Sequence, residues 1–279
     1  MKPFIIKNKF GRVLSDIESW KTGFIEVKKE PRHWRPDYSA HSLGVFFTEG
    51  KEKDQCSNGQ RWVEGLVEKI TGHPFLFGEA EIKHASKVDT YRGGQRMQDL
   101  SIWGESDGAS VFIGIEAKVL ESFDKKVVEL YNELFNESLE YNEYKQKNPR
   151  SMKDKRIENL VARFFPGKLP TDDTIGDFRY QLLHYIASSQ QEGITLKESR
   201  KRLGERVTPD IVILPVIVFR TPHYYEDKKQ AEDNKNDYLT CLGAIGFKKD
   251  DSLSYKGTDV FVLEASYQSV YSVYAEIDI

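Results

Sequence analysis

The most constraining feature of this sequence is residues 111–119, VFIGIEAKV, a hydrophobic run that contains two charged residues. Both faces of the run are apolar up to Ile115, a pattern typical of a central strand covered on both sides. Because side chains alternate along a strand, Glu116 and Lys118 project from one face, opposite to Ile115 and Ala117. Charged groups in such a strand require a physical reason.

We expect this strand to be the second half of a β-hairpin. Residues 98–103 and 109–119 are rich in β-branched and aromatic side chains, and the intervening 104–108, GESDG, has turn composition. Pairing about this turn brings Asp99 near Glu116 and its neighbouring lysine. Two carboxylates and an ammonium are costly to bury unpaired, and a hard cation would remove that cost.

Asp99 and Glu116 offer the oxygen ligands that Mg²⁺ prefers. This ion commonly takes one or two protein carboxylates, keeps several waters and completes its shell with a phosphate. Lys118 could then orient or activate a water, or stabilise charge on the phosphoryl oxygens. The alternative is an ordinary solvated ion pair on a strand surface, which the apolar character of the strand disfavours.

An acid at the end of one strand and E-x-K on the next resembles the motif of the PD-(D/E)xK nuclease superfamily. Here the motif consists of Asp99 and Glu116-Ala117-Lys118, and Gln98 stands where the namesake has proline. The resemblance implies an α/β fold with a restriction-endonuclease-like core, in which helices flank a mixed central β-sheet with N-terminal and C-terminal additions. We expect residues 1–55 to form an N-terminal extension packed on a nuclease-like domain of residues 56–279.

The function implied by the resemblance is a metal-dependent nuclease that hydrolyses phosphodiester bonds. Mg²⁺ or Mn²⁺ is the implied cofactor, and nucleic acid is the implied partner, DNA in preference to RNA. The resemblance also allows a homodimer. The alternative is a nuclease-fold protein without catalysis that serves as a nucleic-acid-binding or protein-interaction module. The motifs G-x-S-x-G, P-loop and H-E-x-x-H are missing from the sequence, which disfavours an unrelated hydrolase.

Residues 57–71 predict a helix, because apolar side chains recur at helical spacing between Ser57 or Asn58 as N-cap and Gly72 as the stop. In the nuclease superfamily, the helix before the catalytic hairpin often contributes a glutamate to the metal site. The resemblance therefore makes Glu64 a further metal ligand, with a solvated helix face as the alternative.

Three regions offer contacts to a phosphate backbone. Arg92 and Arg96 lie in a glycine-rich loop that could approach a phosphate closely, although a generic turn explains the loop equally well. On a helix expected over residues 173–189, Gln181 matches the glutamine or basic residue that family members place near the active centre.

The third region is the basic segment 197–206, which contains Arg200, Lys201 and Arg202. Such a run is either a solvated helix face or a surface that follows a nucleic-acid backbone.

Composition adds weaker constraints. The formal net charge of −3 provides no global basic field, so contacts with nucleic acid must come from local patches. Cys56 and Cys241 show no metal-ligand spacing. The longest apolar run, residues 211–219, is too short to span a bilayer, and Pro215 within it predicts an edge strand or a bulge. With no usual signal peptide, we expect a cytoplasmic protein without membrane contact.

Overall fold

The structure is a computed structural model of mixed α/β architecture, as the sequence predicts. It describes residues 4–29, 31, 34–36, 38–50, 56–86, 88–89, 96–135, 152–192, 210–265 and 268–279. Among these residues, no helix combines the length and the apolar character needed to cross a membrane.

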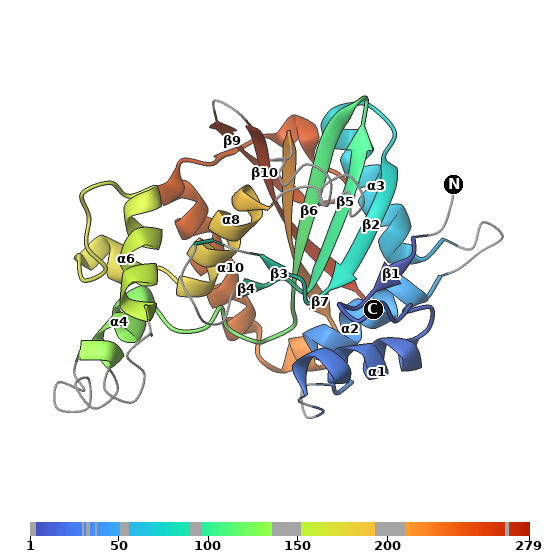
Figure 1. The fold of residues 1–279 in the computed structure, drawn as a ribbon, viewed down its shortest axis with the longest axis horizontal. Coiled ribbons are helices and arrows are strands. Elements are labelled where there is room, and N and C mark those ends of the chain that lie inside the picture. Colours follow the sequence, from blue (N-terminus) through green and yellow to red (C-terminus); the bar gives the residue numbers. More distant parts are fainter. Residues whose placement is uncertain are drawn as a thin grey trace.

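Eight strands form one mixed sheet (Figure 1). In spatial order they are β1 (Ile6–Lys7), β2 (Leu76–Ile82), β5 (Leu100–Ser106), β6 (Ala109–Lys118), β7 (Ile211–Arg220), β10 (Gln268–Asp278), β9 (Asp259–Ala265) and β8 (Lys248–Lys249). The central strands β6, β7 and β10 run parallel, while β2, β5 and β6 pair antiparallel. Two short strands, β3 (Ala85–Ser86) and β4 (Arg96–Met97), pair separately.

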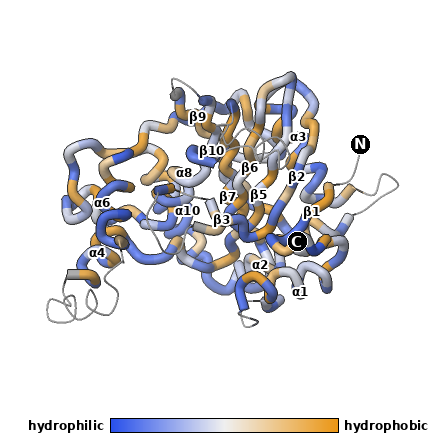
Figure 2. The backbone as a smooth tube through the Cα atoms, in the orientation of Figure 1, coloured by the Kyte–Doolittle hydropathy of each residue, from blue (hydrophilic) through white to orange (hydrophobic). Residues whose placement is uncertain are grey.

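Helices cover both faces of the sheet (Figure 1). One face packs against α1 (Ile17–Lys28), α2 (Ser39–Thr48) and α3 (Asn58–Thr71). The other packs against α8 (Tyr180–Gln191) and α10 (Lys228–Ile245). Outside α8 lie α6 (Lys153–Phe164), α4 (Val127–Phe135) and α7 (Asp173–Gly176), which share its hydrophobic cluster. Two 3₁₀ turns, η2 (His223–Glu226) and η3 (Asp251–Leu253), complete the described elements. Hydrophobic stretches gather at the sheet, whereas the outlying helices α4 and α6 alternate hydrophobic and hydrophilic residues (Figure 2).

The N-terminal residues share the core of the sheet. Trp20 and Phe24 of α1 and Leu43 of α2 are buried in the same cluster as Ile115 and Ala117 of β6. The segment before residue 56 therefore packs directly on the central strands, and its strand β1 pairs with β2.

The predicted hairpin is present, with a tighter turn than its composition suggested. Strands β5 and β6 continue to Ser106 and from Ala109, so the loop is only Asp107-Gly108. Both loop residues have positive φ, 50° and 77°, as a two-residue type I′ hairpin requires. The predicted helix over residues 57–71 is confirmed as α3, with Ser57 accepting a hydrogen bond at its N-terminus and Gly72 ending it at φ 76°.

The helix expected over residues 173–189 is divided into α7 and α8. Between them the backbone pairs with residues 125–127: the Val127 amide donates to the Phe178 carbonyl (2.8 Å), and the Tyr180 amide donates to the Lys125 carbonyl (3.1 Å). These tertiary hydrogen bonds replace helical ones, and they bring Gln181 into the first turn of α8.

The expectation of an edge strand or a bulge at Pro215 is wrong. Strand β7 is central, between β6 and β10, and Pro215 stays in register with Val273 of β10. Toward β6 the pairing is interrupted, because the register skips Gly114 and Ile115 and resumes at Glu116. A proline supplies no amide hydrogen, so a carbonyl of the neighbouring strand loses its donor there.

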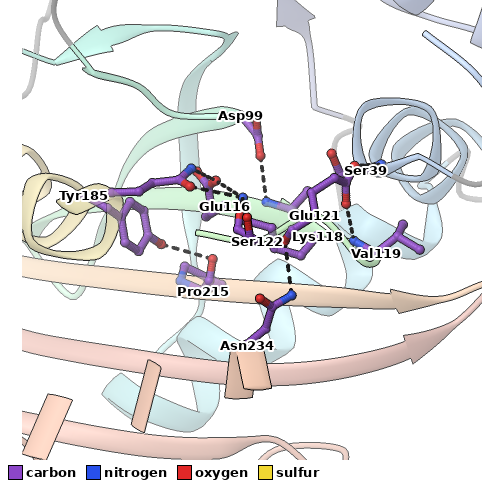
Figure 3. Close-up of polar contacts among 12 residues, drawn as sticks. Ser39, Asp99, Glu116, Lys118, Val119, Glu121, Ser122, Tyr185, Pro215 and Asn234 are labelled. Carbon is purple, nitrogen blue, oxygen red and sulfur yellow. Dashed lines mark hydrogen bonds and ion pairs between the residues drawn. The ribbon is translucent and has the colours of Figure 1, made fainter. Parts of the chain in front are cut away.

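The hydroxyl of Tyr185, on α8, is inserted at this interruption. Its oxygen lies 2.5 Å from the carbonyl oxygen of Gly114 and 3.0 Å from that of Pro215, so its single proton is shared between the two carbonyls. Figure 3 shows the contact with Pro215. Tyr185 is fully buried, so the hydrogen bonds satisfy carbonyl groups that have no access to water. The defect that Pro215 makes in the sheet thereby fixes the position of α8.

We predict that Tyr185→Phe lowers the free energy of unfolding by about 1–3 kcal/mol, because buried carbonyls lose their donor. In a Pro215→Ala background the loss should be smaller, since the new amide can serve Gly114. Urea unfolding of both single variants and the double variant measures this coupling. The control is Tyr225→Phe at an exposed tyrosine, which should change stability by less than about 0.5 kcal/mol. An equal Tyr185→Phe loss in both backgrounds would contradict the bridging role.

Candidate functional site

A polar cleft of about 440 Å³ opens where β5 begins and β6 ends. Asp99, Glu116, Lys118 and Gln181 all line it, so the structure brings together these four of the residues selected from the sequence. As predicted, the charged side chains of β6 alternate with the apolar Ile115 and Ala117, which are buried in the opposite core. Lys83, which the sequence analysis did not select, also lines the cleft.

Asp99 is held by the hairpin and by Lys83. Its amide donates to the Ile115 carbonyl (3.0 Å), its Oδ2 accepts from the Ala117 amide (2.7 Å), and its Oδ1 forms an ion pair with the Lys83 ammonium. Burial alone would raise the pKa of the Asp99 carboxyl. The Lys83 ammonium and the Ala117 amide lower it by more, so the pKa lies below its ordinary value and the group is ionised at neutral pH.

Glu116, Lys118 and Gln181 form one buried network across β6 and α8. Figure 3 shows Glu116 and Lys118 at the end of β6. The Gln181 amide donates to Glu116 Oε1 (2.5 Å), and the Lys118 ammonium lies 3.1 Å from the same oxygen. Lys118 also donates to Gln181 Oε1 (3.3 Å) and to the Ser122 carbonyl (3.4 Å). The side chains of Glu116 and Lys118 are only 3% and 8% exposed, so this is not the solvated ion pair of a strand surface.

Gln98, the residue at the motif's proline position, has a structural explanation. It is fully buried, donates to the Ser189 hydroxyl of α8 (2.5 Å) and accepts from the Ser101 hydroxyl (2.9 Å). Its side chain also lies over Gly114, where a Cβ would approach it within 2.6 Å. Gln98 therefore ties the hairpin to α8 beside the Tyr185 contact.

Glu64 is not brought to the cleft. Helix α3 packs on the face of the sheet opposite to α8, and Glu64 Oε1 accepts from Gln60 of the same helix (3.2 Å). Arg92 and the triplet Arg200, Lys201 and Arg202 lie outside the described residues. Of Arg96 only the backbone, in β4, is described.

Lys83 is the site residue that sequence reasoning missed. It directly follows β2, sixteen positions before Asp99, and no sequence motif joins the two. Only the antiparallel pairing of β2 with β5, which aligns Ile82 with Leu100, makes them neighbours.

The carboxylates of the cleft are the groups that could hold a hard divalent cation. Within the described part of the chain, no group of three or more His, Cys, Asp and Glu side chains is arranged to hold a metal. Mg²⁺ requires only one or two protein carboxylates beside water and phosphate oxygens, which Asp99 and Glu116 can supply. A cation that binds Asp99 at Oδ1 must displace the Lys83 ammonium, which forms an ion pair with that oxygen.

A second charged cluster lies beside the cleft, around His84. Its Nδ1 is 3.2 Å from Glu81 Oε1, and its Nε2 is 3.4 Å from Glu192 Oε2. Burial alone would lower the pKa of His84, but the carboxylates of Glu192 and Glu81 outweigh it and raise the pKa to about 9. The imidazolium therefore links the end of β2 to the end of α8.

This cluster predicts a pH-dependent stability. Because the folded-state pKa lies above the unfolded value of about 6.5, the stabilisation is complete below about pH 6.5 and is lost as the pH rises through about 9. We expect the free energy of unfolding to fall by up to about 3 kcal/mol across this range. Chemical unfolding at several pH values should show the fall in the wild type and a flatter profile in His84→Gln. The control His73→Gln, at a half-exposed histidine, should keep the wild-type profile; an unchanged profile in His84→Gln would refute the assignment.

Comparisons with known proteins give a family and no function. No curated protein and no solved structure matches the chain. Residues 14–254 match the family model described as "Domain of unknown function (DUF6946)". This match spans most of the chain, from the residues before α1 to η3, and the chain therefore belongs to that family.

Proposed function

We propose that the chain is a metal-dependent nuclease that hydrolyses phosphodiester bonds of nucleic acid, with DNA favoured over RNA, at the cleft of Asp99, Glu116 and Lys118. The observation that carries the proposal is the arrangement at one cleft: Glu116 and Lys118 form a buried polar network with the sequence-distant Gln181, and Asp99 lines the same cleft. A central hairpin followed by helices and a parallel strand is also consistent with the restriction-endonuclease-like core that we propose.

In this reaction, the residues of the cleft would have separate roles. Asp99 and Glu116 would hold Mg²⁺ or Mn²⁺ through carboxylate oxygens. When bound, such a cation supplies positive charge to the phosphoryl oxygens and lowers the pKa of a bound water. Gln181 orients Glu116 and Lys118 together, and the Lys118 ammonium can position a water or stabilise charge on the phosphoryl group.

The test is cleavage of plasmid DNA, linear DNA and RNA with Mg²⁺, Mn²⁺ or EDTA. We expect cleavage that requires the metal and falls at least about a hundredfold in Asp99→Asn, Glu116→Gln and Lys118→Met, because each removes a cation ligand or a charge in the transition state. The matched control is Glu105→Gln, an exposed acid at the far end of the same hairpin, which should keep wild-type activity.

Wild-type activity in Glu116→Gln and Lys118→Met would refute the proposal. The absence of cleavage, together with the absence of Mg²⁺ or Mn²⁺ binding that depends on Asp99 and Glu116, would instead favour a nuclease-fold module that binds nucleic acid or a protein without catalysis.

A further inference from the structure

Both the backbone and the side chain of Lys83 contact Asp99. Its backbone amide donates to the Asp99 carbonyl (3.2 Å), and its ammonium pairs with Asp99 Oδ1. The backbone of Lys83 is left-handed, with φ 52°, where the chain turns out of β2. The backbone position is therefore set by the fold, while the four-carbon side chain can still move its ammonium.

The cleft is close to neutral with Lys83 and Lys118 in place, since Lys28 and Asp124, which also line it, add one charge of each sign. The charges of Asp99 and Glu116 are matched by those of Lys83 and Lys118, in pairs at Asp99 Oδ1 and Glu116 Oε1. The side chains of Lys83 and Asp99 are 15% and 11% exposed, so water screens their interaction weakly. A divalent cation at Asp99 would meet the Lys83 ammonium at close range, and like charges at such a distance repel strongly.

A cation at the other oxygen of Asp99, which accepts from the Ala117 amide (2.7 Å), would still lie close to the Lys83 ammonium, because both oxygens belong to one carboxylate. A cation that takes up Asp99 Oδ1 must therefore displace Lys83. The ammonium lies at the cleft, 5.4 Å from the ring centroid of Phe24, and its stem is long enough to keep it there after leaving Asp99. A phosphate group in the cleft would give it a new anionic partner.

We propose that the Lys83 ammonium occupies the cation position at Asp99 in the free protein. When a divalent cation binds there, the Lys83 side chain moves and its ammonium pairs with a phosphate group of the substrate instead. This inference rests on the proposed function, since it assumes the metal centre of Asp99 and Glu116. Its consequence is cooperativity: metal and phosphate backbone each favour binding of the other, because one displaces Lys83 and the other accepts it.

The first experiment titrates the purified proteins with Mn²⁺ by calorimetry, without nucleic acid. We expect Lys83→Met to bind Mn²⁺ about tenfold more tightly than the wild type, because the competing ammonium is gone and Oδ1 of Asp99 lacks its cationic partner. Lys83→Arg should retain weak binding, since it keeps the charge. The control Lys21→Met removes one positive charge at the exposed Glu18 pair of α1 and should bind like the wild type.

The second experiment adds a phosphorothioate-protected oligodeoxynucleotide, which resists cleavage. In the wild type it should tighten Mn²⁺ binding about tenfold, and by linkage Mn²⁺ should tighten oligonucleotide binding by the same factor. In Lys83→Met both effects should shrink toward none. A merely structural role of Lys83 predicts weaker metal binding in the variant, so the direction of the change separates the two explanations.

Two results would overturn the inference in distinguishable ways. Wild-type metal binding and cleavage that depend on Asp99, with unchanged or weaker Mn²⁺ affinity in Lys83→Met, would refute the role of Lys83 and leave the proposed nuclease intact. Mn²⁺ binding that is absent from both the wild type and Lys83→Met would refute the metal centre itself, and the inference with it.

Discussion

Pro215 deprives a central strand of one amide hydrogen, and the rest of the site depends on how the fold replaces it. The hydroxyl of Tyr185 shares its proton between the carbonyls of Gly114 and Pro215 and so attaches α8 to the sheet. Because residues four apart lie on one side of a helix, Gln181 is then directed at Glu116 and Lys118. A backbone defect in the sheet is thus coupled, through one turn of helix, to the geometry of the cleft.

The cleft itself is defined by charge balance. Two carboxylates and two ammonium groups are buried together, and hydrogen bonds from the Ala117 amide and from Gln181 hold the carboxylates in place. Buried charges of this kind are tolerated because every one has a partner. The same balance makes the site sensitive to any added cation, since one of the four groups must then move.

Sequence reasoning predicted the local elements that periodicity and turn chemistry specify. It located the β5–β6 hairpin, the face on which Glu116 and Lys118 lie, and helix α3 with both of its ends. Its prediction of an edge strand or a bulge at Pro215 was wrong. The β propensity of a residue does not consider a side chain on another element that replaces the missing hydrogen bond. It also missed Lys83, which becomes a neighbour of Asp99 only through pairing between β2 and β5.

The sequence by itself determined the acid and the E-x-K of the hairpin, because alternation and a two-residue turn are local properties of the chain. Only the tertiary structure decided which further residues join them. It brought Gln181 to the cleft, as the resemblance implied, added Lys83, and left Glu64 on the opposite face of the sheet, which α3 covers. The physical reason is that strand order and helix packing are non-local: which face a helix covers depends on burial of the whole sheet, and no spacing within α3 or β2 encodes it.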